Sequence, residues 1–425
     1  MRVSTITQGA VSGAASVESR ASWFVACTAV GIAAVSFGAP FVAVVALKQI
    51  AADLGSPRQI PALAYSLSWL GSAAGGIAMG FVAERVGVRW TVIFGAVMIA
   101  AGLCLATAGT GIALLVGHGV FIGVLGNAGI NAPLYVYVAR WFDRRRGTAL
   151  ALMASGTSVA GAIWSPIFAY GIERIGWRGT MLAFAAVELA LIVPAALLVL
   201  RPPPEPAQAL GSTETRRRDE PVLGLRPNIV LALLMAAGFC CCVPMAMPQG
   251  HLVALCSDLG IPATRGAAML SVLLGCAFFS RQAWGLVADR VGGLRTVLAG
   301  SLCQIVAMIG FLLTQSEAGL FAISTVFGLG FSGIIPAYVL AVRELFPAAE
   351  ASWRVPSVLL MTGSGMAAGG WAAGAIYDAV GAYNVAFALG IAFNLANLIL
   401  VGALVLRARG SRQAAPEPAL PASAD

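Results

Sequence analysis

Charged residues are scarce in this chain: Asp, Glu, Lys and Arg make up 10% of its 425 residues, whereas about a quarter of the residues of a soluble domain are charged. Lysine occurs once, as Lys48 after Leu47, so the sequence has no nucleotide-binding loop of the G-x-x-x-x-G-K type. Histidine occurs only at positions 118 and 251, and neither belongs to an H-E-x-x-H zinc motif. These absences argue against an enzyme.

The eight cysteines show no C-x-x-C or zinc-binding spacing. Three of them are consecutive, at 240–242, and consecutive residues of a helix point about 100° apart, so these thiols cannot converge on one metal ion. We therefore expect small packing residues, and neither a metal site nor a cofactor.

Apolar residues dominate instead, at 59% of the chain with a mean hydropathy of +0.88. A helix of about 20 apolar residues spans the roughly 30 Å hydrocarbon core of a bilayer. The sequence predicts an all-α protein embedded in a lipid bilayer, with twelve transmembrane helices at 22–46, 60–82, 90–108, 111–138, 147–170, 179–200, 228–250, 264–287, 294–314, 319–342, 355–377 and 382–405.

The basic residues predict the orientation of these helices, because short cytoplasmic loops collect Lys and Arg. If both termini are cytoplasmic, twenty arginines lie inside and only Lys48, Arg58, Arg174, Arg178 and Arg265 lie outside. The net charge of +8 is then an orientation signal, and we expect no nucleic-acid partner. The excess of Arg over Lys and the many alanines favour a bacterial inner membrane.

A sequence repeat divides the chain. Gly80–Thr91 (GFVAERVGVRWT) recurs as Gly285–Thr296 (GLVADRVGGLRT), 205 residues further on. The repeat predicts two six-helix halves, at 1–200 and 227–408. Between them, 201–226 is rich in Pro and charge and is predicted to be a cytoplasmic linker, and 409–425 a disordered cytoplasmic tail.

Arg281 lies inside one apolar run, eight residues before the next charge at Asp289, which is about 12 Å along a helix axis. A guanidinium near the bilayer centre costs about 2.5 kcal/mol or more, and it cannot lose its proton. An anionic substrate in a water-filled cavity would compensate it. The alternative is a structural arginine paired with a carboxylate or with carbonyls at a helix end.

The repeated segment resembles the signature loop of the major facilitator superfamily, Gly-x-x-x-Asp-Arg-x-Gly-x-Arg. The matching positions are Gly80, Arg85, Gly87 and Arg89 in the first copy, with Glu84 in place of Asp, and Gly285, Asp289, Arg290 and Gly292 in the second, where Arg295 stands one residue later than the last arginine of the motif. The resemblance implies a major facilitator fold whose halves rock against each other. We expect Glu84 to pair with Arg140 and Asp289 with Arg343, as a latch that closes the cytoplasmic side together with Arg85, Arg89 and Arg290. The alternative is that these charges only orient the helices.

A second stretch, Arg140–Ala149 followed by Ala154–Gly161, is similar to monocarboxylate transporters and oxalate:formate antiporters. In both groups an arginine of the eighth helix binds the substrate carboxylate, and Arg281 has that place. Ala277 and Phe41 stand where the monocarboxylate group carries Asp and Lys, and 355–377 lacks the lysine of the oxalate group. The resemblance implies a small organic anion, most simply a monocarboxylate.

Helical spacing selects further candidates for the wall of the cavity. Tyr65 and Trp69 share one helix face, and so do Asn127, Asn131 and Tyr135. Hydrogen bonding between helices is the alternative role for such side chains.

Two titratable residues and two glycine pairs complete the candidates. Glu188 interrupts the sixth apolar run, either as a proton-coupling group or as a neutral carboxyl hydrogen-bonded to a neighbouring helix. His251 is expected in a solvated loop, with a pH-sensitive gate residue as the alternative. The pairs Gly71/Gly75 and Gly365/Gly369 predict close approach of the second and eleventh helices across the halves.

These expectations combine into a monomeric secondary transporter of small organic anions that works by alternating access, with proton symport favoured. The alternatives are a carboxylate exchanger, efflux of drugs or metabolites by the same fold, and a sensor that binds a solute without moving it.

Overall fold

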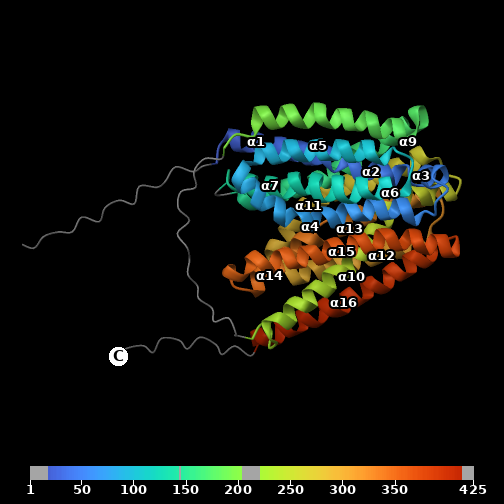
Figure 1. Cartoon of the computed structure of the whole chain (residues 1–425). Coiled ribbons are helices and arrows are strands. Elements are labelled where there is room, and N and C mark those ends of the chain that lie inside the picture. The colour runs from blue at the N-terminus through green and yellow to red at the C-terminus, as the bar shows by residue number, and fades with distance from the viewer. Residues whose placement is uncertain (1–17, 143–144, 203–220, 414–425) are drawn as a thin grey trace, which may run out of the picture.

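The computed structural model describes residues 18–142, 145–202 and 221–413, and helices make up nearly all of this part (Figure 1). The first half contains α1 (Arg20–Ser36), α2 (Gly38–Val45), α3 (Leu47–Asp53), α4 (Gln59–Val86), α5 (Val88–Ala106), α6 (Gly111–Val116), the π-helix η1 (Gly117–Asn127), α7 (Ala128–Ala139), α8 (Arg146–Ala154) and α9 (Gly156–Val199). The second half contains α10 (Pro227–Asp258), α11 (Ala263–Val291), α12 (Gly293–Leu313), α13 (Glu317–Phe331), α14 (Ile334–Leu345), α15 (Ala348–Val380) and α16 (Asn384–Gln413).

Twelve crossings can be counted in the described part of the chain. Ten segments are long and apolar enough to span a membrane, and one of them, the 53-residue Gly147–Val199, bends at Gly176 (φ 70°, ψ 170°) and so crosses twice. The 33-residue α15, packed against α10 and α4, is the twelfth. The prediction of an all-α protein with twelve transmembrane helices is confirmed.

The sequence repeat appears as two equivalent turns. Gly87 separates α4 from α5 at φ 92°, and Gly292 separates α11 from α12 at φ 85°. Both values lie in the region that glycine adopts without steric cost. The two copies therefore use their glycines for the same purpose, a sharp turn between consecutive helices.

The two halves meet at one end of the molecule and separate at the other. We call the end that holds the start of α1 and the end of α16 the terminal face, and the end that holds α3 the distal face. In Figure 1 the halves converge towards α3 and splay towards the terminal face. Their most extensive contacts join α4 to α15 and α9 to α11.

The predicted glycine pairs contact other helices than expected. Added Cβ atoms at Gly71 and Gly75 would clash with backbone atoms of η1, and those at Gly365 and Gly369 with backbone carbonyls of α10. Both pairs thus tighten packing within a half, and the expectation that they join α4 to α15 was wrong. That contact is made by other glycines of α15, namely Gly363, Gly370 and Gly374, which pack on α4.

The predicted linker and tail are described only in part. Helix α9 ends at Val199 and α10 begins at Pro227, while 203–220 lie outside the described residues. Helix α16 continues to Gln413, so the first five residues of the expected tail are helical, and 414–425 lie outside the described residues. So do Arg2, Arg144 and 216–218, which contribute to the count of basic residues.

Candidate functional site

A cavity of about 1320 Å³ lies between the two halves. Its lining reaches the terminal ends of several helices, including the α4–α5 turn at Gly87, Arg201 after α9 and Arg343 in α14. At its other end, Phe41, Met245 and Gln249 line it. The cavity therefore opens at the terminal face.

Positive charge predominates in the lining. Among the described residues, the cavity is lined by one carboxylate, Glu84, and by five arginines: Arg89, Arg140, Arg201, Arg281 and Arg343. A cleft lined by one sign of charge concentrates counter-ions of the opposite sign. This lining favours an anionic ligand.

Arg281 crosses from α11 to the first half. Its Nη1 donates to the carbonyl of Ala154, and its Nη2 lies 3.4 Å from Ser158 Oγ. Ala154 ends α8, and the carbonyl end of a helix carries partial negative charge. Its Nε is buried without a hydrogen-bond partner, and no carboxylate in the described structure pairs with the side chain. The helix end thus compensates Arg281 only in part.

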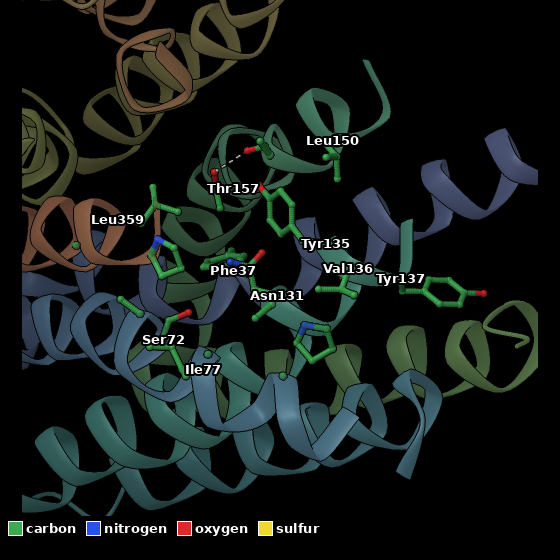
Figure 2. A pocket seen from close by; sticks show the side chains of 18 of the residues that line it. Phe37, Ser72, Ile77, Asn131, Tyr135, Val136, Tyr137, Leu150, Thr157 and Leu359 are labelled. Atoms are coloured by element: carbon green, nitrogen blue, oxygen red, sulfur yellow. Dashed lines mark hydrogen bonds between the residues drawn. The ribbon is translucent and has the colours of Figure 1, made fainter. Parts of the chain in front are cut away.

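Polar and aromatic side chains share the lining with Arg281. In Figure 2 Asn131 of α7 points towards Phe37 at the α1–α2 junction, whereas the hydroxyl end of Tyr135, also of α7, points towards Thr157. Phe37 stacks on Trp69 with ring centroids 5.6 Å apart. In the first turn of α9, Thr157 Oγ1 donates to the Ala154 carbonyl at 3.4 Å. The site combines a few polar groups with an apolar wall, as ligand pockets generally do.

Ion pairs and hydrogen bonds close the distal face between the halves. Asp258 of α10 accepts from Lys48 Nζ at 2.8 Å and from Arg58 Nη2 at 2.8 Å. Asp378 of α15 accepts from the backbone N–H groups of Arg58 at 2.9 Å and Gln59 at 2.8 Å, which begin α4. We call Lys48, Arg58, Asp258 and Asp378 the distal cluster.

Arg58 is the central cation of the distal cluster. Its guanidinium carbon lies 3.7 Å from the ring centre of Tyr377. Burial opposes its charge, but hydrogen bonds with Asp258 and Tyr383 outweigh burial and raise the pKa of Arg58. The pair therefore stays charged at any physiological pH, and the cavity is closed distally while it is open at the terminal face.

The sequence model of the Major Facilitator Superfamily matches residues 25–352. The chain belongs to the major facilitator superfamily. The members of this family and the relatives that this chain resembles are transporters and not enzymes.

Curated relatives of this major facilitator protein are distant. The MFS-type transporter pynF of Aspergillus niger is 28% identical over 293 residues, which cover 66% of this chain and 65% of the fungal protein. Monocarboxylate transporter 13 of Bos taurus is 26% identical over 323 residues, 74% of this chain and 73% of that one. Monocarboxylate transporter 3 of Rattus norvegicus is 26% identical over 385 residues, 86% and 76% of the two chains.

Solved structures support the same fold. A bacterial homologue of the human lysosomal transporter Spinster, in an inward-facing and unoccupied conformation, has a TM-score of 0.71 at 16% identity and covers 95% of this chain and 100% of that one. The structure of the nucleoside transporter NupG has a TM-score of 0.69 at 14% identity, and the match covers 90% of this chain and 99% of NupG. At such identities the likeness concerns the fold alone.

The predicted substrate-binding residues fall into two groups. Arg281, Trp69, Asn131 and Tyr135 line the cavity, whereas Tyr65 and Asn127 do not. Their role in binding stays a prediction.

The two residues outside the lining are buried. Tyr65, 1% exposed, packs against Phe41, Gly250 and Gly370 between the cavity and the distal face. Asn127 ends η1, and neither of its side-chain polar atoms has a hydrogen-bond partner in the described structure. The alternative of a hydrogen bond between helices is thus not observed for Asn127.

Sequence reasoning missed the distal cluster and several polar residues of the cavity lining, among them Thr157, Ser158 and Gln249. Lys48 and Arg58 were a signal for the cluster, because they are among the few basic residues that the sequence places on the non-cytoplasmic side. A signal for Thr157 and Ser158 is the Ser-Gly-Thr-Ser run at 155–158.

The predicted latch residues gather at the terminal face. Glu84, Arg89, Arg140 and Arg343 line the mouth of the cavity, whereas Arg85, Asp289 and Arg290 lie outside the lining. In the described part of the chain no ion pair joins Glu84 to Arg140 or Asp289 to Arg343. A latch that closes the terminal face would be separated in this state, so both pairs stay predictions.

Glu344 of α14 binds the second of the two equivalent turns. Its Oε2 accepts from the backbone N–H of Gly293, the first residue of α12, at 2.9 Å. The carboxylate therefore satisfies one of the unpaired donors at the start of that helix.

Glu188 is fully buried in α9 and does not line the cavity. Neither of its carboxyl oxygens has a hydrogen-bond partner among the described residues. The expected hydrogen bond to a neighbouring helix is therefore wrong for this state, and a role in proton coupling stays a prediction.

Proposed function

We propose that this major facilitator protein is a secondary transporter of small organic anions, most simply monocarboxylates, and that Arg281 binds the substrate carboxylate. The observation that carries the proposal is a buried guanidinium in the cavity with an unpaired Nε and no carboxylate partner in the described structure. Such a charge is costly in a membrane unless an anion or helix-end groups compensate it. The resemblance to monocarboxylate transporters 13 and 3 favours a carboxylate as that anion.

The surrounding residues fit such a ligand. A guanidinium holds a carboxylate by two parallel hydrogen bonds. Tyr135 and Asn131 offer further donors, while the stacked rings of Phe37 and Trp69 offer an apolar surface for the body of the acid. We assign all four to the substrate site on this basis.

The proposed cycle alternates two closures. The distal cluster closes one face in the present state. In the opposite state the distal cluster separates, and Glu84–Arg140 and Asp289–Arg343 pair across the terminal mouth. We favour symport of a proton with the anion over exchange, because 355–377 lacks the lysine of the oxalate:formate antiporters. The bias of basic residues favours a cytoplasmic terminal face in a bacterial inner membrane.

Paired measurements on Arg281 variants test the anion site. In proteoliposomes, Arg281→Ala should abolish uptake of labelled monocarboxylates and should also abolish the thermal shift that they produce. Arg281→Lys should weaken binding, because a point charge cannot form the planar fork. Arg201→Ala is the matched control, because it removes another arginine of the same lining.

The possible outcomes separate the alternatives. A structural Arg281 predicts a lower melting temperature of Arg281→Ala with normal uptake per folded molecule, and that result would refute the anion site. Binding of a carboxylate without counterflow would identify a sensor. Counterflow without net proton-driven uptake would identify an exchanger. Transport of an uncharged or cationic compound by Arg281→Ala would favour efflux.

A further inference from the structure

His251 connects the cavity wall to the distal cluster. It lies in α10, two residues after Gln249 of the cavity lining and seven before Asp258 of the cluster. Its side chain is 1% exposed, so the expectation of a solvated loop histidine was wrong. The ring instead bridges α10 to α15 and to the segment before α16.

The hydrogen bonds of His251 fix its protonation state. Nε2 lies 2.8 Å from the carbonyl oxygen of Gly370, which can only accept, so Nε2 carries a hydrogen. Nδ1 lies 3.1 Å from the hydroxyl of Tyr383, and that hydroxyl accepts from Arg58 Nη1 at 3.3 Å. The hydroxyl hydrogen can then point to Nδ1. The chain Arg58–Tyr383–His251–Gly370 is complete when the imidazole is neutral.

A proton on Nδ1 breaks this chain. An Nδ1–H group must donate to the Tyr383 oxygen, which turns the hydroxyl hydrogen away and sets it against the Arg58 donor. It also places a second cation beside Arg58. The carboxylates that face this region, Asp258 and Asp378, are already bound to Arg58, to Lys48 or to the start of α4.

We propose that His251 is a proton-operated switch of the distal cluster: the cluster closes when Nδ1 is unprotonated, and a proton on Nδ1 opens it. A proton that binds the open state better than the closed state shifts the population towards the open state. Acid on the distal side thus holds the transporter open to that side. This inference needs alternating access but does not depend on which substrate is carried.

Distance measurements without substrate test the switch. Spin labels at Ala52 of the first half and Thr264 of the second, in a cysteine-free protein, report separation of the distal ends. Between pH 7.5 and 5.5 the ratio of open to closed molecules should rise, by at most about tenfold per pH unit for one proton.

A substitution of His251 should remove the response, and a substitution of its partner Tyr383 should reduce it. His251→Gln keeps a donor for Gly370 and an acceptor for Tyr383, so it should stay closed at both pH values. Tyr383→Phe should reduce the response with His251 intact, because protonation then breaks no bond to the hydroxyl. His118→Gln is the matched control: it changes the other histidine, also buried, which bonds Leu114 in the first half, and should respond as wild type.

Three results would overturn the switch. One is a wild-type protein whose distal distance does not change with pH. Another is a full response in His251→Gln, which would assign pH sensing to a group other than His251. The third is a full response in Tyr383→Phe, which decides the matter even if His251→Gln fails to fold. Because no substrate is present, none of these results bears on the anion site.

Discussion

Asp378→Ala should open the distal face, because Asp378 caps a helix of the opposite half. The residue at the start of α4, Arg58, offers no side-chain cap of its own. The Asp378 carboxylate instead accepts from the N–H groups of Arg58 and Gln59 at 2.9 and 2.8 Å. The cap exists only while the halves touch, so its loss destabilises the closed state alone.

The size of the effect follows from the energetics of helix caps. Removal of a side-chain cap costs about 0.5–2 kcal/mol. A cost of about 0.5–2 kcal/mol changes an equilibrium by about 2- to 30-fold. We expect the ratio of open to closed molecules to increase by that factor, measured between spin labels at Ala52 and Thr264 at pH 7.5.

Asp53→Ala provides the matched control for this measurement. Asp53 is also an aspartate of the distal face, but its partners Arg178 and Trp177 belong to the same half. Its loss should leave the distance distribution unchanged. An equal shift in both variants, or no shift in Asp378→Ala, would refute the idea that the cap is a property of the closed state.

Three more changes have defined outcomes. Gly374→Ala places a Cβ 2.9 Å from the Ala62 side chain of α4 and should shift the same distance towards the open form, whereas Gly402→Ala, with nothing within 4 Å, should not. Glu188→Leu removes two buried oxygens that have no hydrogen-bond partner in the described structure. It should stabilise the protein against thermal unfolding by about 1–3 kcal/mol and leave uptake per folded molecule unchanged. Loss of proton-driven uptake would instead make Glu188 the coupling group. Hydrogen bonds from Trp177 and Arg178 lower the pKa of Asp53 from 3.8. The ionised Asp53 therefore stabilises the folded protein at pH values above 3.8, and this stabilisation is lost as the pH falls through the lowered pKa. The difference in melting temperature between wild type and Asp53→Asn should accordingly be widest near neutral pH and vanish in acid; a constant difference would contradict this.

The features that sequence predicted are those that depend on local spacing. Runs of about 20 apolar residues predicted the crossings, and the repeated segment marked the two loops that turn at Gly87 and Gly292. Arg281 was found because a charge in an apolar run is conspicuous without any knowledge of its neighbours. In each case the physical signal lies within a few residues of chain.

The missed features depend on contacts between distant residues or on how far the cavity extends along a helix. Arg58 and Asp378 are separated by 320 positions, and no spacing rule relates them. Asn127 shares the helix face of Asn131 but lies one turn before it, at the end of η1, and no residue of η1 lines the cavity. The glycine pairs of α4 and α15 revealed close packing but not the partner helix.

The shared cap at the start of α4 also makes two backbone amides direct reporters of the transport cycle. While the halves touch, the amide hydrogens of Arg58 and Gln59 are bound by Asp378 and should exchange slowly with deuterated water. Each opening of the distal face exposes them, so their exchange rate measures how often an unlabelled, unmodified molecule opens. A peptide covering this turn would therefore record, in native membranes and without any substitution, how the protein divides its time between its two faces.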